Sequence, residues 1–263
     1  MPSRPPLKPP PQPPAPVDEA AYEARARIEL ARWRGRMAKG PTALDRAARS
    51  VQLRINRAIP EPVHQVVTTV IETMTRAIVN GADFITADPL AGAPLSEREA
   101  RVARRIAAYR AAAAAEGGVA GAGGFALAAA EFPTLIATKI KLLFDIAALY
   151  GHDGACLDER LYILSIFQLA FSSADRRNEV LATIGAWDLH DQDRPKNLEQ
   201  VDWRRFQLEY RDYIDLAKLA QLIPVIGAPV GAVVNYRMLD RLGEIAIGAY
   251  RLRWFADQAR PKP

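Results

Sequence analysis

The sequence predicts an all-α protein: a single compact multi-helix domain with two glycine-rich helix-packing elements, preceded by a disordered proline-rich tail. Three observations favour this class. Apolar residues recur at helical spacing through most of the chain. No stretch alternates apolar and polar residues between hairpin turns, as a half-buried strand would. The interruptions of the helical pattern coincide with proline, glycine or capping residues.

Composition and charge narrow the function classes. The 263 residues are 49% hydrophobic and 25% charged, which is ordinary for a globular protein with a substantial core. The single cysteine, Cys156, excludes an internal disulfide and a zinc site built from cysteines. Of the net charge of +5, residues 1–39 carry +4 (8 Lys/Arg against 4 Asp/Glu) and the other 224 residues carry +1. A partner nucleic acid is therefore not expected.

Residues 1–16 contain 9 of the 20 prolines and are expected to be an extended, disordered tail. Residues 17–39 form a predicted basic amphipathic helix. It could lie on an anionic membrane surface, or it could pack on its own domain and expose its arginines to water; the periodicity fits both. Its expected inward stripe is Val17, Ala21, Ala24, Ile28 and Ala31, with Leu30, Trp33 and Met37 flanking it. The candidates for membrane contact are Arg25, Arg32, Trp33 and Arg36.

Residues 40–258 are predicted to form one helical domain, with a short tail over residues 259–263. Ser96–Glu99 has the S-x-x-E form of a capping box, which starts a helix. Gly151 is a natural helix stop. The expected helices are Thr42–Ile59, Val63–Phe84, Ser96–Ala115, Leu127–Tyr150, Leu157–Phe171, Val201–Leu222 and Val230–Gln258, and a short helix with loops is expected in Ser172–Gln200.

Two glycine-rich elements punctuate this domain, Glu116–Phe125 and Ile223–Ala232. Each contains glycines four residues apart, a G-x-x-x-G spacing that lets two helices approach closely. A phosphate-binding loop is disfavoured, because no Lys follows the last glycine of the first element and helical rather than strand sequence precedes it. The residues assigned to the elements are Glu116, Gly117, Gly118, Gly121, Gly123 and Gly124, and Pro224, Gly227, Gly231 and Asn235.

Catalytic and membrane-spanning interpretations have weaker support. Residues 117–137 carry one charge, but glycine and alanine dominate them and Pro133 interrupts them. Buried core helices are thus favoured over a span, with a re-entrant hairpin as the alternative. Glu116, Asp145 and His152 are the weak candidates for acid–base catalysis, since carboxylates in apolar surroundings must be paired or have raised pKa values. No nucleophile–base arrangement, metal site or cofactor is predicted.

At the same residues the sequence resembles the EcsC family. That family has an E-G-G-x-x-G-x-G-G-like stretch, an apolar helix ending in Y-G-x-D, a Pro/Gly element and a Tyr–Arg-rich helix. The matching segments, in the same order, are Glu116–Gly124, Tyr150–Asp153, Ile223–Asn235 and Tyr250–Arg253. The family is named for a bacterial protein encoded beside an ABC-type transporter. The resemblance implies a bacterial protein that is either cytoplasmic or associated with the periphery of the inner membrane, and it leaves the activity open.

Two functions remain as expectations. The first is a non-enzymatic helical module that associates with an anionic membrane surface or a membrane protein complex. The alternative is an enzyme or small-ligand-binding protein with a pocket at the glycine-rich loop around Glu116. A pocket holding Glu116, Asp145 and His152 together would favour the alternative, and an exposed apolar face beside the N-terminal arginines would favour the first.

Overall fold

The computed structural model describes residues 17–39, 88–122, 124–172, 174–187 and 227–260, and every regular element in these ranges is a helix. The all-α prediction is therefore confirmed. The helices expected at 42–59, 63–84 and 201–222 lie outside the described residues, as does the proline-rich tail.

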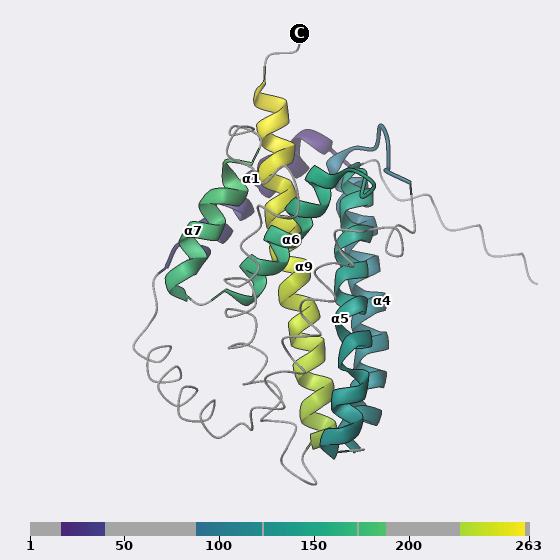
Figure 1. Ribbon diagram of the computed structural model, residues 1–263. Coiled ribbons are helices and arrows are strands. Elements are labelled where there is room, and N and C mark those ends of the chain that lie inside the picture. Colours follow the sequence, from purple (N-terminus) through teal and green to yellow (C-terminus); the bar gives the residue numbers. More distant parts are fainter. Residues whose placement is uncertain (1–16, 40–87, 123, 173, 188–226, 261–263) are drawn as a thin grey trace, which may run out of the picture.

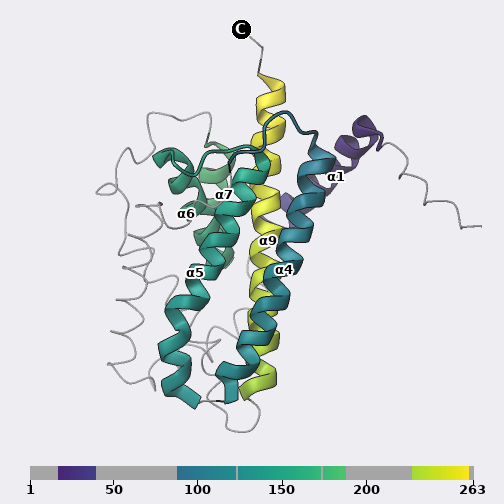
Figure 2. The same cartoon turned by 90° about the vertical axis from the view of Figure 1, so that its right-hand side faces the viewer.

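Three long helices lie side by side and form the centre of the fold (Figures 1 and 2). They are α4 (Leu95–Ala122), α5 (Gly124–Tyr150) and α9 (Gly227–Ala259). α4 and α9 run in opposite directions, so the beginning of α4 lies beside the end of α9. That pairing brings residues about 150 positions apart in the sequence together at one end of the bundle.

Three shorter helices cover the same end of the bundle. α6 (Leu157–Phe171) and α7 (Ala174–Gly185) pack on one side of α9, and α1 (Glu19–Met37) crosses α4 and α9 (Figure 2). All six helices contribute side chains to one buried apolar cluster. The largest side chains that are fully buried are Leu95, Ile140, Leu142, Leu143, Ile146, Tyr162, Phe167 and Tyr250.

Gly151 ends α5 as predicted, with a positive φ of 92° that L side chains rarely adopt. The N–H of Gly151 donates to the carbonyl of Ala148, and the N–H of His152 donates to that of Ala147, both at 2.9 Å. This is the Schellman pattern, which satisfies the last carbonyls of a helix. The Arg98 guanidinium occupies the space that a Cβ at Gly151 would need, with Nη1 2.8 Å away. The stop fixes the position of the segment after α5 against α4 and α9.

The start of α4 differs from the predicted capping box. α4 begins at Leu95, and the N–H of Ser96 donates to the Glu19 carboxylate of α1 at 3.1 Å. Glu99 does not reach back to the helix end, because its carboxylate is buried and accepts from Arg251 of α9. A tertiary contact thus replaces the local cap.

Both glycine-rich elements contribute to helices. α4 continues through Glu116 to Ala122, past the expected end at Ala115, and α5 begins at Gly124. α9 begins at Gly227. These three helix ends lie together at the end of the bundle opposite α1 (Figures 1 and 2). The close packing expected at Gly121 and Gly227 stays a prediction. Among the described residues, no helix combines the length and the apolar character needed to cross a membrane.

The buried face of α1 is the opposite of the predicted one. Ala26, Leu30 and Trp33 are buried, whereas the expected inward stripe is exposed, with Val17 61% and Ile28 54% exposed. Both sets recur at helical spacing, so periodicity could not separate them. The buried set removes more apolar area from water because it contains tryptophan and leucine. The stripe formed by Val17, Ala21, Ala24, Ile28 and Ala31 is called the outer stripe below.

Candidate functional site

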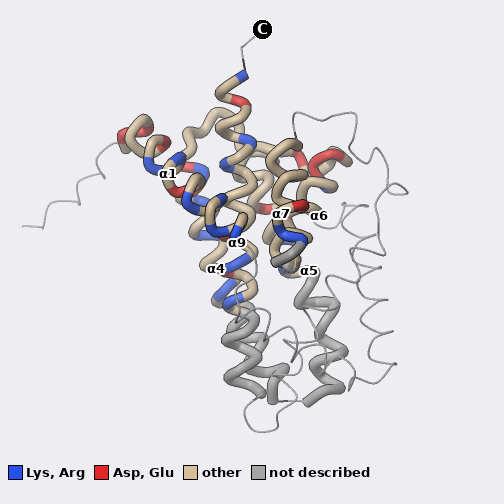
Figure 3. The backbone as a smooth tube through the Cα atoms, turned by 90° about the vertical axis from the view of Figure 1, so that its left-hand side faces the viewer, with Lys and Arg blue, Asp and Glu red and all other residues tan. Residues whose placement is uncertain are grey.

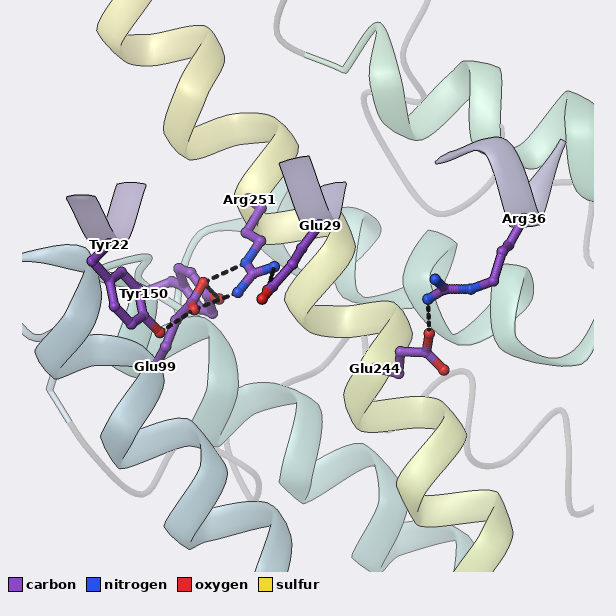
Figure 4. Close-up of polar contacts among 7 residues, drawn as sticks. All are labelled: Tyr22, Glu29, Arg36, Glu99, Tyr150, Glu244 and Arg251. Carbon is purple, nitrogen blue, oxygen red and sulfur yellow. Dashed lines mark hydrogen bonds and ion pairs between the residues drawn. The ribbon is translucent and has the colours of Figure 1, made fainter. Parts of the chain in front are cut away.

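A groove of about 350 Å³ lies between α1 and α9. Its lining combines apolar and charged side chains from both helices, and Figure 4 shows several of the charged ones with their partners. The lining residues are Glu29, Leu30, Arg32, Trp33, Arg36, Glu244, Ile247, Gly248 and Arg251.

Gly248 lets α1 and α9 approach closely at this groove. A Cβ at Gly248 would lie 2.4 Å from Cε2 and 2.6 Å from Cδ2 of Trp33. The indole ring therefore occupies the space where any other residue would have a side chain. Trp33 is only 3% exposed, and its Nε1–H has no hydrogen-bond acceptor. Buried donors without a partner are rare in folded proteins and cost free energy.

Arg251 closes one end of the groove. Its Nε and Nη2 donate to the two carboxylate oxygens of Glu99, at 2.6 and 2.7 Å, and its Nη1 donates to Glu29 at 2.8 Å (Figure 4). The Glu99 carboxylate also accepts from the hydroxyls of Tyr22, at 2.6 Å, and Tyr150, at 3.0 Å. One buried carboxylate thus connects α1, α4, α5 and α9. Four donors satisfy it, as a buried charge requires.

Burial and the Glu99 charge shift the ionisation of these partners. Burial, then the neighbouring carboxylate, raises the pKa of the Tyr150 hydroxyl well above its ordinary value, and the pKa of Tyr22 rises for the same reasons. Burial alone would lower the pKa of Arg251, but its hydrogen bonds and attraction to Glu99 raise it overall. The tyrosines therefore stay protonated and donate, and Arg251 stays charged.

A second buried glutamate–arginine pair adjoins the pair of Glu99 and Arg251. Glu159, in the first turn of α6, accepts from the Tyr250 hydroxyl and from Nη1 of Arg253, both at 2.6 Å. Burial raises the pKa of this carboxyl despite its attraction to Arg253. The rings of Tyr150 and Tyr250 stack at 5.1 Å, so the two glutamate–arginine pairs share one aromatic contact. His152 stacks on the other side of this set, 5.3 Å from Tyr250.

The rim of the groove is charged and exposed. Arg36 donates to Glu244, and both side chains are about half exposed. Arg32 forms no ion pair with any residue that the structure describes. The groove offers guanidinium donors, and no nucleophile lies next to a general base among its described lining residues. Such a site is suited to binding rather than to covalent chemistry.

Two of the candidate catalytic residues, Asp145 and His152, lie in different contacts. Asp145 accepts from the Tyr109 hydroxyl at 2.9 Å and lies 3.5 Å from Arg105, whereas Nδ1 of His152 lies 3.7 Å from the Glu159 carboxylate. Glu116 falls within α4, eleven residues beyond Arg105, or about 16 Å along the helix axis. Asp145 and His152 thus have separate partners.

Sequence reasoning missed the residues that organise the groove. Glu99 was assigned to a cap, and neither Gly248 nor Gly243 was singled out. Gly243 is also tightly packed, since a Cβ there would lie 2.6 Å from Cδ1 of Ile106. Two glycines in the middle of a long helix cost about 1 kcal/mol each against alanine. The presence of two such glycines within one predicted helix was therefore the sequence feature that indicated two close contacts with neighbouring helices.

Comparisons with known proteins agree on one family. The model of the EcsC protein family matches residues 24–255. Protein EcsC of Bacillus subtilis (strain 168) is 39% identical over 232 residues, which cover 88% of this chain and 95% of that protein. Uncharacterized protein YdbA of the same organism is 34% identical over 145 residues, 54% of this chain and 52% of that protein. No solved structure matches.

Proposed function

The chain belongs to the EcsC protein family, and we propose that it is a non-enzymatic helical module that associates with an anionic membrane surface through the outer face of α1. The observation that carries this proposal is the separation of opposite charges across α1. Three of the four acidic side chains at α1 contact other helices, whereas most of its basic side chains form no ion pair with a described residue.

Three acidic residues of α1 contact other helices. Glu19 accepts from the N–H of Ser96, Glu23 accepts from Trp254 and Gln258, and Glu29 accepts from Arg251. The fourth, Asp18, caps the helix by accepting from the N–H of Ala21. Lys and Arg recur along α1 (Figure 3). The exposed basic residues of this segment that form neither an ion pair nor a side-chain hydrogen bond with a described residue are Arg25, Arg32, Arg34 and Lys39, since Arg27 donates to Gln258 and Arg36 to Glu244.

The outer stripe lies between the basic residues. At about 100° per residue, Arg25, Arg32 and Arg36 fall on one flank of the stripe and Arg27 and Arg34 on the other. This is the pattern of a helix that lies in the interface plane of a membrane. Trp33 is not part of that face, because it is buried against α9 and holds α1 on the domain.

Electrostatic attraction is expected to dominate the binding. The outer stripe has only two large apolar side chains, Val17 and Ile28, and both are already partly covered. Full burial of such a side chain contributes about 1.5–3 kcal/mol, so the remaining exposed half contributes less. Four unpaired basic residues at about 1 kcal/mol each supply more. Association should therefore weaken steeply as salt is added.

Co-sedimentation of the full-length protein with anionic and neutral vesicles tests the proposal. The double variant Arg25→Glu/Arg32→Glu should lose most of its binding to anionic vesicles. A matched control, Arg104→Glu/Arg237→Glu, makes the same change in net charge at exposed positions of α4 and α9 and should keep it. Equal binding by both variants, or no binding by the unaltered protein, would contradict the proposed role of α1.

A further inference from the structure

We propose that the α1–α9 groove binds one phosphate-type oxyanion, the group that an anionic lipid headgroup or a soluble phosphate compound carries. The inference deepens the proposed function, and it rests on that function where the oxyanion belongs to a lipid headgroup. Its basis is the set of arginines that line the groove and the positions of two exposed carboxylates.

The groove gathers three arginines against two glutamates. Arg32 and Arg36 come from α1 and Arg251 from α9, so both walls of the groove contribute arginines. Figure 4 shows Arg36 directed to Glu244 and Arg251 directed to Glu29 and Glu99. Arginine is suited to phosphate because its planar fork presents several N–H groups in fixed directions. The volume of about 350 Å³ falls at the lower end of the range of small-molecule sites, about 300–1,000 Å³. A phosphate group with a short polar substituent would be accommodated.

The Trp33 indole forms part of the wall of the groove. Its carbon Cε2 lies over Gly248, another lining residue. Because Gly248 has no side chain, no Cβ separates the indole from α9 at this point. The Nε1 atom is sealed from solvent and has no acceptor among the described residues, so it is not one of the donors that an anion in the groove could reach.

Two exposed carboxylates form ion pairs with arginines that would hold the anion. Glu29 is 58% exposed and pairs with Arg251, and Glu244 is 51% exposed and pairs with Arg36. Exposed ion pairs contribute only about 0–1 kcal/mol, so a phosphate group loses little by displacing them. The buried Glu99 stays in place and fixes the guanidinium of Arg251 from behind. Glu29 and Glu244 are thus competitors for the site.

The position of the groove agrees with the proposed membrane contact. Arg32 lies between the outer stripe and the groove, on the flank that also carries Arg36. A membrane that contacts the outer stripe would therefore bring phosphate groups to the mouth of the groove. The oxyanion site thus adjoins the surface that makes the general electrostatic contact and shares Arg32 with it.

Isothermal titration calorimetry on the full-length protein tests the inference. The probes are inorganic phosphate and a short-chain phosphatidylglycerol below its micelle concentration, with a short-chain phosphatidylcholine for comparison. Arg36→Gln should weaken binding of the phosphate-type probe about 10- to 100-fold, as for the loss of a charged hydrogen bond. Trp33→Phe keeps a ring over Gly248 and removes the sealed N–H, so it serves as a control and should leave the affinity unchanged. Glu244→Gln removes a competing carboxylate and should tighten binding about 3-fold or more.

The Glu244→Gln variant separates binding from folding, because a merely structural role of the ion pair would not improve affinity. Saturable binding of phosphatidylglycerol but not of inorganic phosphate identifies a lipid headgroup, and the reverse identifies a soluble phosphate compound. Affinities unchanged in Arg36→Gln and in Glu244→Gln, or no saturable binding of either phosphate probe, would overturn the inference. Vesicle co-sedimentation that persists in that case would leave the proposed function standing. Phosphate binding without vesicle binding would contradict the proposed membrane association and leave the phosphate-binding inference standing.

Discussion

Glu99 should be among the most costly residues to neutralise in this protein. Glu99→Gln keeps the shape of the side chain but removes the charge that faces Arg251, whose side chain is 12% exposed. Loss of one partner of a buried ion pair costs about 3–5 kcal/mol, because the remaining charge stays desolvated. Here the amide nitrogen of the glutamine would also face N–H or O–H donors at 2.6–3.0 Å. The expected fall in stability is therefore at the upper end of that range.

The matched control is Glu29→Gln, which alters the exposed partner of the same arginine. It should cost at most about 1 kcal/mol, because exposed ion pairs contribute little. Urea unfolding followed by circular dichroism measures both variants, and the thermal midpoint of Glu99→Gln should fall by about 6–20 °C for a chain of this size. Equal destabilisation by the two substitutions would refute the assignment of Glu99 as the buried anchor of Arg251.

Two further predictions concern packing and pH. Gly248→Ala should destabilise the protein through overlap with the Trp33 ring, yet in a Trp33→Ala background the same substitution should stabilise it by up to about 1 kcal/mol. Gly35→Ala is the control, because the space around Gly35 is open, and it should stabilise the protein in either background. If the effects of Gly248→Ala and Trp33→Ala on the free energy of unfolding were additive, the close contact between the two residues would be contradicted. Burial raises the pKa of Glu159, so ionisation of this carboxyl opposes folding. Its contribution to stability is therefore fully present below the ordinary pKa of glutamate and is lost as pH rises through the raised pKa of the folded protein. The free energy of unfolding, measured from pH 4 to 8, should show this decline in the unaltered protein and in Glu97→Gln but not in Glu159→Gln.

The sequence predicted helix ends correctly where the local signals for a helix start or stop were strong. Leu157–Phe171 was predicted with the ends that the structure has, because Asp158 and Glu159 favour the first turn of a helix and an uninterrupted apolar run follows. Gly151 was likewise predicted as a stop from its freedom to adopt positive φ. Such features depend on a few adjacent residues, so a single sequence contains the information.

The errors arose where distant residues decide the outcome. α1 has two apolar faces at helical spacing, and the choice between them depends on the gap that Gly248 leaves more than 200 residues away. Glu99 fits a local capping pattern, but a guanidinium 152 residues along the chain is the stronger partner for its carboxylate. The α1–α9 groove combines both contacts. It could not be predicted without knowing which helices are neighbours.

The contacts of Tyr22 and Trp33 have a practical consequence for work with shortened versions of the protein. Both side chains belong to α1, yet Tyr22 donates to the buried carboxylate of α4 and Trp33 fills the gap over α9. A version that began at residue 40 would uncover Gly248, Arg251 and the apolar surface around them. It should therefore aggregate or melt early for reasons unrelated to membranes or ligands. Shortened versions should begin before Asp18, whose cap holds the first turn of α1.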